Sequence, residues 1–221
     1  MSHRVVIAGG HGQIAQHLIE LLVARGDSAV ALIRNPSHAH EIHALGGEAI
    51  LLDLEHSTVD EAALALEGAD VAVFAAGAGP NSGAARKDTV DRAAAVLLAD
   101  AAERAGARRF IQISTFGAGE PIPDDAGEVW TAYLRAKTAA EEDLRGRDGL
   151  DWTILRPGRL TNDPPTGLVA LSAPPLPKGG VPRADVAAVV AALIDAPATV
   201  GTTLLLTRGA TTIPEAVADS V

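Results

Sequence analysis

The side chains best suited to acid–base chemistry in this sequence are a tyrosine and a lysine four residues apart. Tyr133 is the only tyrosine of the chain, and Lys137 follows it. On a helix, this spacing places both side chains on one face. A phenol has a reference pKa of about 10, so it exchanges protons poorly near neutral pH unless a nearby cation favours the phenolate. Lys137 can supply that cation, and the pair is therefore a candidate proton-transfer site.

Two hydroxyl side chains end an apolar segment upstream of this pair. Ser114 and Thr115 follow the apolar residues 109–113, which are typical of a buried strand. A hydroxyl at the end of such a strand can hold the carbonyl oxygen of a substrate. The predicted catalytic residues are therefore Thr115, Ser114, Tyr133 and Lys137. A Tyr-x-x-x-Lys spacing alone is common by chance, so the prediction depends on the rest of the chain.

A glycine-rich turn near the start of the chain predicts where a cofactor binds. Apolar residues 4–8 lead into this turn, and a helix pattern at 12–25 follows it. Gly10-x-Gly12-x-x-Ala15 fits the fingerprint of dinucleotide-binding turns: Gly10 permits the tight turn, Gly12 lets the backbone approach a pyrophosphate, and Ala15 allows close packing. The free N–H groups of the helix N-terminus then favour phosphate, although a purely structural turn is the alternative. The residues predicted to bind the dinucleotide here are Gly9, Gly10, His11, Gly12, Gln13 and Ile14.

Further segments complete this predicted site. Arg34 stands about 20 residues past the fingerprint, where an NAD site places an acid, and a guanidinium there suits the 2′-phosphate of NADP. NADP is therefore the predicted cofactor, with NAD possible; the alternative for Arg34 is a solvated strand end. Asp53 ends another apolar segment, where it can accept a hydrogen bond from an adenine amino group or begin a turn. The remaining predicted contacts are Leu54, the small residues Ala75, Ala76 and Gly77, and Lys137, which would bind ribose hydroxyls.

Apolar segments and helix-like segments alternate along most of the chain. This alternation predicts an α/β fold with a doubly wound parallel sheet, a Rossmann fold, in which ligands bind at the carboxyl edge of the strands. We expect a single NAD(P)-binding domain over residues 1–221, with a core at 1–157 and a reduced, substrate-covering lobe with a final strand and helix at 158–221. The expected strands are 4–8, 29–33, 49–52, 70–75, 109–113, 152–156, 167–171 and 202–207. The expected helices are 12–25, 37–45, 58–67, 87–105, 129–145, 183–195 and a short one at the end.

The composition argues against several classes of protein. The formal net charge of −10 disfavours nucleic acid and anionic membranes as partners, because both require a basic face. There is no cysteine, so disulfides and thiolate metal sites are excluded. The apolar segments are too short to span a bilayer and no secretory signal pattern is evident, so we expect a cytoplasmic protein. No metal site is predicted either, because His38 and His40 would point apart on a helix.

Several motifs follow one another in a fixed order: the Gly9–Gly12 turn, Arg34, Asp53-Leu54, Ala75-Ala76-Gly77, Ser114-Thr115, Tyr133-x-x-x-Lys137 and Thr153–Gly158. Together they resemble the atypical and extended short-chain dehydrogenase/reductases, in the NAD(P)-binding, epimerase/dehydratase-like group with its NmrA-like relatives. The resemblance covers nearly the whole chain. It implies that Thr115 or Ser114, Tyr133 and Lys137 form the catalytic set. It also implies that Pro157 and Gly158 lie near the nicotinamide.

The sequence thus predicts an NADP-preferring oxidoreductase or epimerase-like protein that acts on a small-molecule substrate, as a monomer or homodimer. Hydride would pass between the nicotinamide and a substrate carbon, while Tyr133 exchanges the proton, Lys137 tunes it, and Thr115 or Ser114 orients the oxygen. Two alternatives stay open. One is a non-catalytic NADP(H)-binding redox sensor, which has no need of the Tyr133–Lys137 pair. The other is a flavin- or quinone-type reductase, which transfers hydride without a tyrosine.

Overall fold

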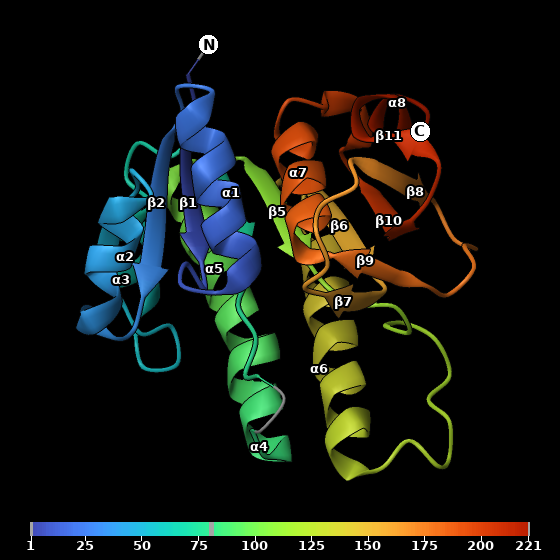
Figure 1. Cartoon of the computed structure of the whole chain (residues 1–221). Coiled ribbons are helices and arrows are strands. Elements are labelled where there is room, and N and C mark those ends of the chain that lie inside the picture. Colours follow the sequence, from blue (N-terminus) through green and yellow to red (C-terminus); the bar gives the residue numbers. More distant parts are fainter. Residues whose placement is uncertain (1, 80–81, 221) are drawn as a thin grey trace.

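The computed structural model describes residues 2–79 and 82–220 as one large sheet covered by helices on both faces (Figure 1). The strands are β1 (Arg4–Ala8), β2 (Ser28–Ile33), β3 (Glu48–Leu51), β4 (Val71–Phe74), β5 (Arg109–Ile113), β6 (Asp151–Pro157), β7 (Arg159–Thr161), β8 (Leu168–Ser172), β9 (Gly180–Pro182), β10 (Thr202–Arg208) and β11 (Thr211–Thr212). Within the described residues the main sheet has the order β11-β8-β10-β6-β5-β4-β1-β2-β3, and β7 pairs with β9 beside it.

Helices cover both faces because successive strand residues point to opposite sides. In β1, Val5 and Ile7 pack into one apolar core, whereas Val6 and Ala8 pack into the other. The first core lies against α1 (Gln13–Ala24), α2 (Ala39–Ala44), α7 (Arg183–Ile194) and α8 (Ile213–Ala218). The second lies against α3 (Val59–Ala65), α5 (Ala94–Ala105) and α6 (Glu128–Arg145). Short segments complete the helices: η1 (Pro36–His38), α4 (Ala84–Arg86), the π-helix η2 (Lys87–Ala93) and η3 (Pro197–Thr199).

The parallel strands place their carboxyl ends along one edge. β3, β2, β1, β4, β5, β6 and β10 are all parallel, while β8 and β11 add an antiparallel margin. In register, Ala8 lies opposite Leu32 on one side and Phe74 on the other. Figure 1 shows α4 and α6 extending beyond this edge, which faces the bottom of the view. Residues that follow these strands are thereby gathered along one line.

The predicted fold class is confirmed, and every predicted strand and helix has a counterpart. Two details differ. Most of residues 158–221 continues the main fold, because β8, β10 and β11 extend the sheet and α7 packs beside α1, so only β7, β9 and their connections stand apart. The helix predicted at 87–105 is α-helical only from Ala94, since its first part is the π-helix η2. In the described part of the chain, no helix combines the length and apolar character needed to cross a membrane.

Candidate functional site

The glycine turn between β1 and α1 is shaped by contact with the two neighbouring strands. Gly9 has a φ of +76°, and a Cβ there would stand 2.6 Å from the Cα of Ala76. A Cβ on Gly10 would stand 2.4 Å from the Cβ of Ala31. The left-handed residue of the turn is therefore Gly9. Gly10 is required because its backbone packs directly against β2.

Gly12 has a different role from the other two glycines. A Cβ there would meet only the carbonyl oxygen of Gly9, at 3.1 Å, so the space on its other side is open. Gly12 is the N-cap residue of α1, and within the described residues no side chain caps this helix and no acid occupies its first turn. The N–H groups of the first turn, including those of Gln13 and Ile14, have no partner inside the helix. The turn therefore fits an anion such as a pyrophosphate.

The side chain of His11 packs toward η1 and α2. Its ring stacks on that of His38, with the centroids 3.5 Å apart, and its Nε2 lies 2.9 Å from the carboxylate of Glu41. The Gln16 amide holds the His11 carbonyl oxygen at 2.9 Å. These contacts fix the outer wall of the turn. Among residues 2–79 and 82–220, no group of three or more His, Asp or Glu side chains gathers in a way that could hold a metal ion.

Arg34, at the end of β2, is held by an acid that sequence reasoning missed. Its guanidinium is 59% exposed and donates to Glu55 at 3.3 Å. Glu55 also accepts hydrogen bonds from Arg86 and, at 2.8 Å, from Thr89. These contacts, led by the hydrogen bond from Arg86, lower the pKa of Glu55. Glu55 therefore carries a negative charge that is shared between two arginines at the position expected for the 2′-phosphate.

Asp53 shows the turn geometry that the sequence left as an alternative to adenine binding. One carboxylate oxygen accepts from the Glu55 N–H at 3.1 Å, and the other lies 3.0 Å from Nδ1 of His56. Burial would raise the pKa of Asp53, but the hydrogen bonds from His56 and Glu55 outweigh it and the pKa is lowered. Both oxygens thus already have partners within the loop after β3, next to Leu54.

The small residues after β4 lie directly against the glycine turn. Ala75 continues the pairing with β1 by donating its N–H to the carbonyl oxygen of Ala8 at 3.0 Å. Ala76 contacts Gly9, as described above, and a Cβ on Gly77 would lie 3.2 Å from Oδ1 of Asp91. Ala76 therefore leaves no room for a side chain on Gly9. Ala75 and Ala76 are partly buried and Gly77 is exposed, so the segment lies at the surface beside the glycine turn.

Lys137 projects from α6 into a buried ion pair. Its Nζ lies 3.4 Å from Oδ1 of Asp91 and donates to the carbonyl oxygen of Ile113 at 3.2 Å. Asp91 comes from the π-helix η2, and its other oxygen accepts from the Ala78 N–H at 3.3 Å. The two side chains are 1% and 4% exposed, for Asp91 and Lys137 respectively. Asp91 was not singled out in the sequence, because it stands among helical residues with no motif of its own.

Tyr133 lies among two lysines and a tryptophan. Nζ of Lys137 is 5.9 Å from the centre of its ring, and Nζ of Lys87 is 5.3 Å from it. Lys87 is 5% exposed and donates to the carbonyl oxygen of Gly79 at 2.7 Å. The indole of Trp130 packs at 5.2 Å on the half-buried tyrosine ring. The structure therefore brings the predicted tyrosine and lysine together and adds a second cation, Lys87, from η2.

The two hydroxyls after β5 have different surroundings. Ser114 is 4% exposed, and its Oγ donates to Glu141 at 2.5 Å. Glu141 is fully buried and also accepts from Arg156, at 2.9 and 2.5 Å, and from Arg145 at 2.7 Å. This network binds β5, α6 and β6 to each other. The Ser114 hydroxyl is thus buried and hydrogen-bonded within the protein, whereas Thr115 is partly exposed at the sheet edge.

The Pro157-Gly158 segment lies at the same edge, between β6 and β7. Gly158 donates its N–H to the carbonyl oxygen of Leu206 at 2.8 Å. A Cβ on Gly158 would stand 2.1 Å from the carbonyl oxygen of Gly179, so only glycine fits here. Phe116, just after Thr115, donates its N–H to the carbonyl oxygen of Pro157 at 3.2 Å. The residues predicted near a nicotinamide thus lie next to those predicted to hold the substrate oxygen.

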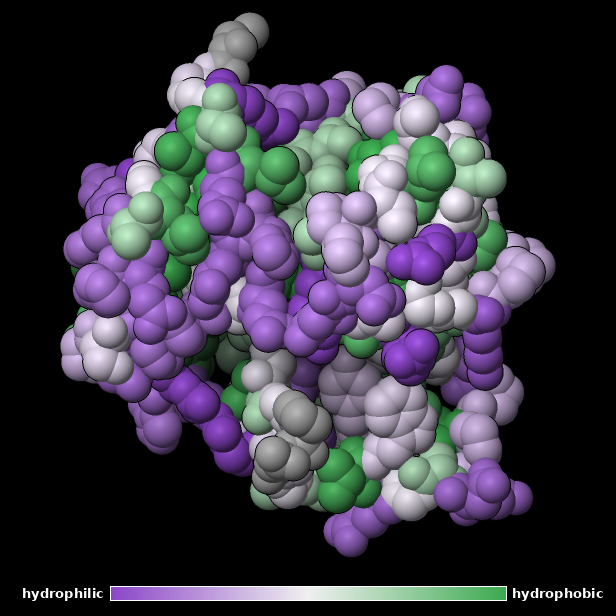
Figure 2. Space-filling view, viewed as in Figure 1, coloured by the Kyte–Doolittle hydropathy of each residue, from purple (hydrophilic) through white to green (hydrophobic). Residues whose placement is uncertain are grey.

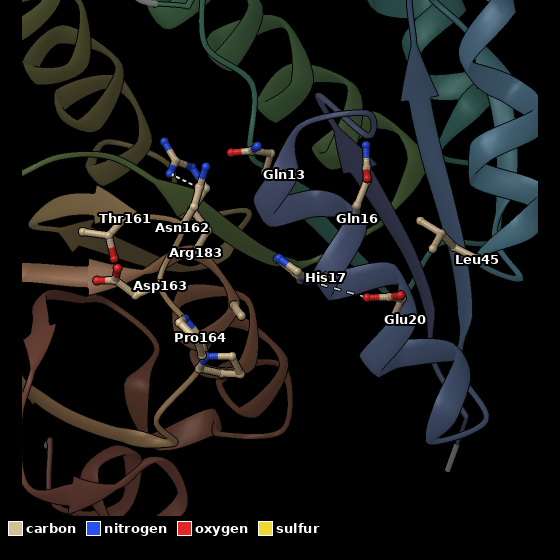
Figure 3. Close-up of a pocket in the computed structure, with 12 residues that line it drawn as sticks. Gln13, Gln16, His17, Glu20, Leu45, Thr161, Asn162, Asp163, Pro164 and Arg183 are labelled. Atoms are coloured by element: carbon tan, nitrogen blue, oxygen red, sulfur yellow. Dashed lines mark hydrogen bonds and ion pairs between the residues drawn. The ribbon is translucent and has the colours of Figure 1, made fainter.

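Two cavities open near this edge. A cavity of about 530 Å³ lies between α1 and the segment after β7: Gln13, His17 and Glu20 face Asn162 and Arg183 across it (Figure 3). The surface of α1 on this side is largely hydrophilic (Figure 2). A second cavity of about 220 Å³ lies between β7, β9 and the end of β10.

Comparisons with known proteins test whether this glycine turn belongs to a nucleotide-binding protein. A family described as NAD(P)H-binding matches residues 9–197, starting at the first glycine of the turn. The chain belongs to this NAD(P)H-binding family. It is 36% identical to the uncharacterized sugar epimerase YhfK of Bacillus subtilis, over 96% of this chain and 98% of that protein.

Solved structures agree with the family. A protein of Bacillus halodurans, provisionally named an NAD-dependent epimerase/dehydratase, is 33% identical with a TM-score of 0.89, covering 98% of this chain and 99% of its own. ChuY, an anaerobilin reductase of Escherichia coli O157:H7, is 27% identical with a TM-score of 0.79. The match covers 93% of this chain and 97% of ChuY. The predicted resemblance and Rossmann-like fold are thereby confirmed. These relatives carry different reaction names, so the NAD(P)H-binding family establishes the type of cofactor and leaves the reaction to be argued from the site.

Proposed function

We propose that this protein is an NADPH-preferring oxidoreductase in which Tyr133 transfers the proton to or from the oxygen of a small carbonyl or hydroxyl substrate. The observation that carries the proposal is the packing of the Tyr133 ring beside the ammonium groups of Lys87 and Lys137, at 5.3 and 5.9 Å. Two cations beside the ring would offset the negative charge that develops on the tyrosine oxygen while its proton is transferred.

The chain offers a matching set of groups for the cofactor. The open space at Gly12, the uncapped first turn of α1 and the small residues after β4 would hold the pyrophosphate and the NMN half, with Pro157 and Gly158 at the nicotinamide. When bound, the nicotinamide supplies or accepts the hydride. Arg34 would hold the 2′-phosphate, and NAD remains the alternative because Glu55 already neutralises part of the charge of Arg34.

Each catalytic side chain then has one task. For reduction of a carbonyl, the carbon receives hydride and the oxygen takes the proton of the Tyr133 hydroxyl. Thr115 would hold that oxygen by hydrogen bonding, and its partly exposed position supports it over Ser114, whose hydroxyl already binds Glu141. Lys137 would stabilise the resulting phenolate and bind the ribose. Asp91 would keep the Lys137 ammonium in place through the buried ion pair.

The decisive experiment measures NADPH oxidation with a panel of aldehydes, ketones, quinones and flavins, in the wild type and in Tyr133→Phe. Phe keeps the packing on Trp130 but has no proton to transfer, so turnover should fall by about 100- to 10,000-fold while NADPH affinity is preserved. Arg135→Ala, at an exposed position of the same helix, serves as the matched control.

Other outcomes of this experiment identify the rival functions. Activity that survives in Tyr133→Phe would indicate a flavin- or quinone-type reductase that needs no tyrosine. Tight NADPH binding with no turnover of any panel member would indicate a redox sensor.

A further inference from the structure

The smaller cavity lies where a substrate bound at the nicotinamide would extend. Its walls come from β7, β9 and the end of β10, and their charged residues are Arg159, Arg208 and Asp163. β10 is parallel to β6, with Leu206 opposite Pro157 in register, so Arg208 ends at the same carboxyl edge as the proposed site. The cavity of about 220 Å³ is therefore part of the edge where the cofactor would bind.

Backbone contacts connect this cavity directly to the proposed nicotinamide position. Arg159 follows Gly158 in the chain and donates its N–H to the carbonyl oxygen of Gly179 at 2.9 Å. That same carbonyl oxygen is the one that leaves no room for a side chain on Gly158. The first arginine of the cavity is thus the residue that directly follows the segment expected at the nicotinamide.

The charge of the cavity is unusual for this chain. The formal net charge of the protein is −10, and most of its arginines form close ion pairs. Within the described residues, however, the guanidinium of Arg159 has neither a hydrogen bond nor an ion pair. Arg208 approaches only Asp163, at 3.9 Å, and both of these side chains are more than half exposed. Two arginines and one acid, Asp163, therefore line this small cavity, so its charged side chains leave a net positive charge.

The uncharged part of the wall suits an anion as well. Thr161 also lines the cavity, and its buried hydroxyl has no hydrogen-bond partner among the described residues. Gly179 and Gly180 bring backbone to the surface of the cavity without side chains. The guanidinium group offers paired N–H donors that match the oxygens of a carboxylate or a phosphate.

We infer that this cavity binds an anionic group, a carboxylate or a phosphate, on the substrate whose reacting carbon lies at the nicotinamide. The inference rests on the proposed function, because it names the substrate class for the same site. The larger cavity beside α1 does not show this character, since one arginine, Arg183, meets the carboxylates of Glu20 and Asp163 there, whereas the smaller cavity has two arginines and Asp163 alone.

The first test measures anion binding without requiring turnover. The NADP⁺-saturated protein is titrated with benzoate and, separately, with inorganic phosphate, and the amide resonances of Gly179 and Gly180 are followed by NMR. Saturable shifts with one probe and not the other identify the anion as carboxylate or phosphate. Binding should weaken by roughly tenfold or more in Arg159→Ala and in Arg208→Ala, as expected when a charge-assisted hydrogen bond is lost. Arg135→Ala should bind as the wild type does. Absence of saturable shifts with both probes would overturn the inference.

The second test compares para-carboxybenzaldehyde with benzaldehyde as substrates for NADPH oxidation. We expect a higher kcat/KM for the carboxylated aldehyde, through a lower KM, and loss of this advantage in Arg159→Ala and Arg208→Ala but not in Arg135→Ala. Equal kcat/KM values for the two aldehydes in the wild type would contradict an anion site while leaving the oxidoreductase proposal intact. Anion binding in the NMR titration together with no turnover of any carbonyl would instead contradict the proposed function and retain the site.

Discussion

The carboxylate of Asp91 and the ammonium of Lys137 form a buried ion pair, 3.4 Å apart, on the inner side of Tyr133. They come from two helices that lie side by side, η2 and α6. Removing one partner of a buried pair leaves an uncompensated charge, which costs far more than the pair itself contributes. The position of Lys137 next to the proposed proton donor therefore depends on an acid in another helix.

Asp91→Asn should destabilise the protein by about 3–5 kcal/mol, because the Lys137 ammonium stays buried without its counter-charge. Lys137→Met should also destabilise it, since it leaves Asp91 unpaired. The double variant should lose clearly less stability than the sum of the two single variants, as expected for residues in direct contact. Urea unfolding of all four proteins measures this coupling, and strict additivity would show that the two charges do not interact.

Gly12→Val should abolish NADPH binding while the fold is preserved. Its φ of −65° and ψ of 150° suit any residue, and a Cβ meets only one protein atom, so the added side chain occupies the space expected for the pyrophosphate. Gly10→Ala provides the contrast, because its Cβ would collide with Ala31 and lower the unfolding temperature instead. Calorimetric titration with NADPH and thermal unfolding separate the two effects. Unchanged NADPH affinity in folded Gly12→Val would mean that the phosphates bind elsewhere.

Arg34→Ala should weaken NADPH binding by roughly tenfold to a hundredfold and affect NADH much less, because only NADPH carries the 2′-phosphate. Glu55→Gln should shift the preference in the opposite direction, toward NADPH, since it removes the carboxylate that shares the charge of Arg34. The measurement is the ratio of the two dissociation constants in each variant. Equal losses for both cofactors in Arg34→Ala would rule out a 2′-phosphate contact.

Acid should remove a specific stabilising contribution of Glu55. Its pKa is lowered in the folded protein, mainly by the hydrogen bond from Arg86, relative to 4.5 for an ordinary glutamate. The contribution to the free energy of unfolding is therefore fully present above that ordinary value, and it is lost as the pH falls through the lowered pKa of the folded state. Glu55→Gln should show a smaller loss of stability than the wild type over this acidic range in urea unfolding. Parallel pH profiles for the two proteins would contradict this role.

Local patterns were sufficient to predict the sheet, the helices and the glycine turn. Apolar runs in parallel strands and small residues in the turn are visible in the sequence, because each reflects the immediate surroundings of a few neighbouring residues. The role of Gly10 could not be derived in this way. It depends on contact with Ala31 of β2, and spacing within the turn does not reveal which strand the glycine meets.

The site residues that the sequence did not predict all contact partners far from them in the chain. Glu55, Lys87 and Asp91 act through side chains that lie in other helices or loops, and no local spacing marks them. Ser114 illustrates the reverse case: its place at a strand end suggested chemistry, but the buried Glu141 from α6 holds its hydroxyl. Sequence alone gives the order of elements along the chain, whereas the direction of each side chain is settled by packing between elements.

The π-helix η2 lets the chain carry one residue more beside Tyr133 than ordinary α-helix would. α4, η2 and α5 follow one another without a break from Ala84 to Ala105, and a π-helical segment is wound more widely than the α-helix on either side. A π-helical turn holds about one residue more than an α-helical turn, so deleting Thr89 would let this segment wind as ordinary α-helix with little net rotation of α4 relative to α5. Lys87 and Asp91, on either side of the deletion, would keep similar directions. Related chains that differ by a single-residue gap here would therefore lose the π-helix and still place both side chains near the ring.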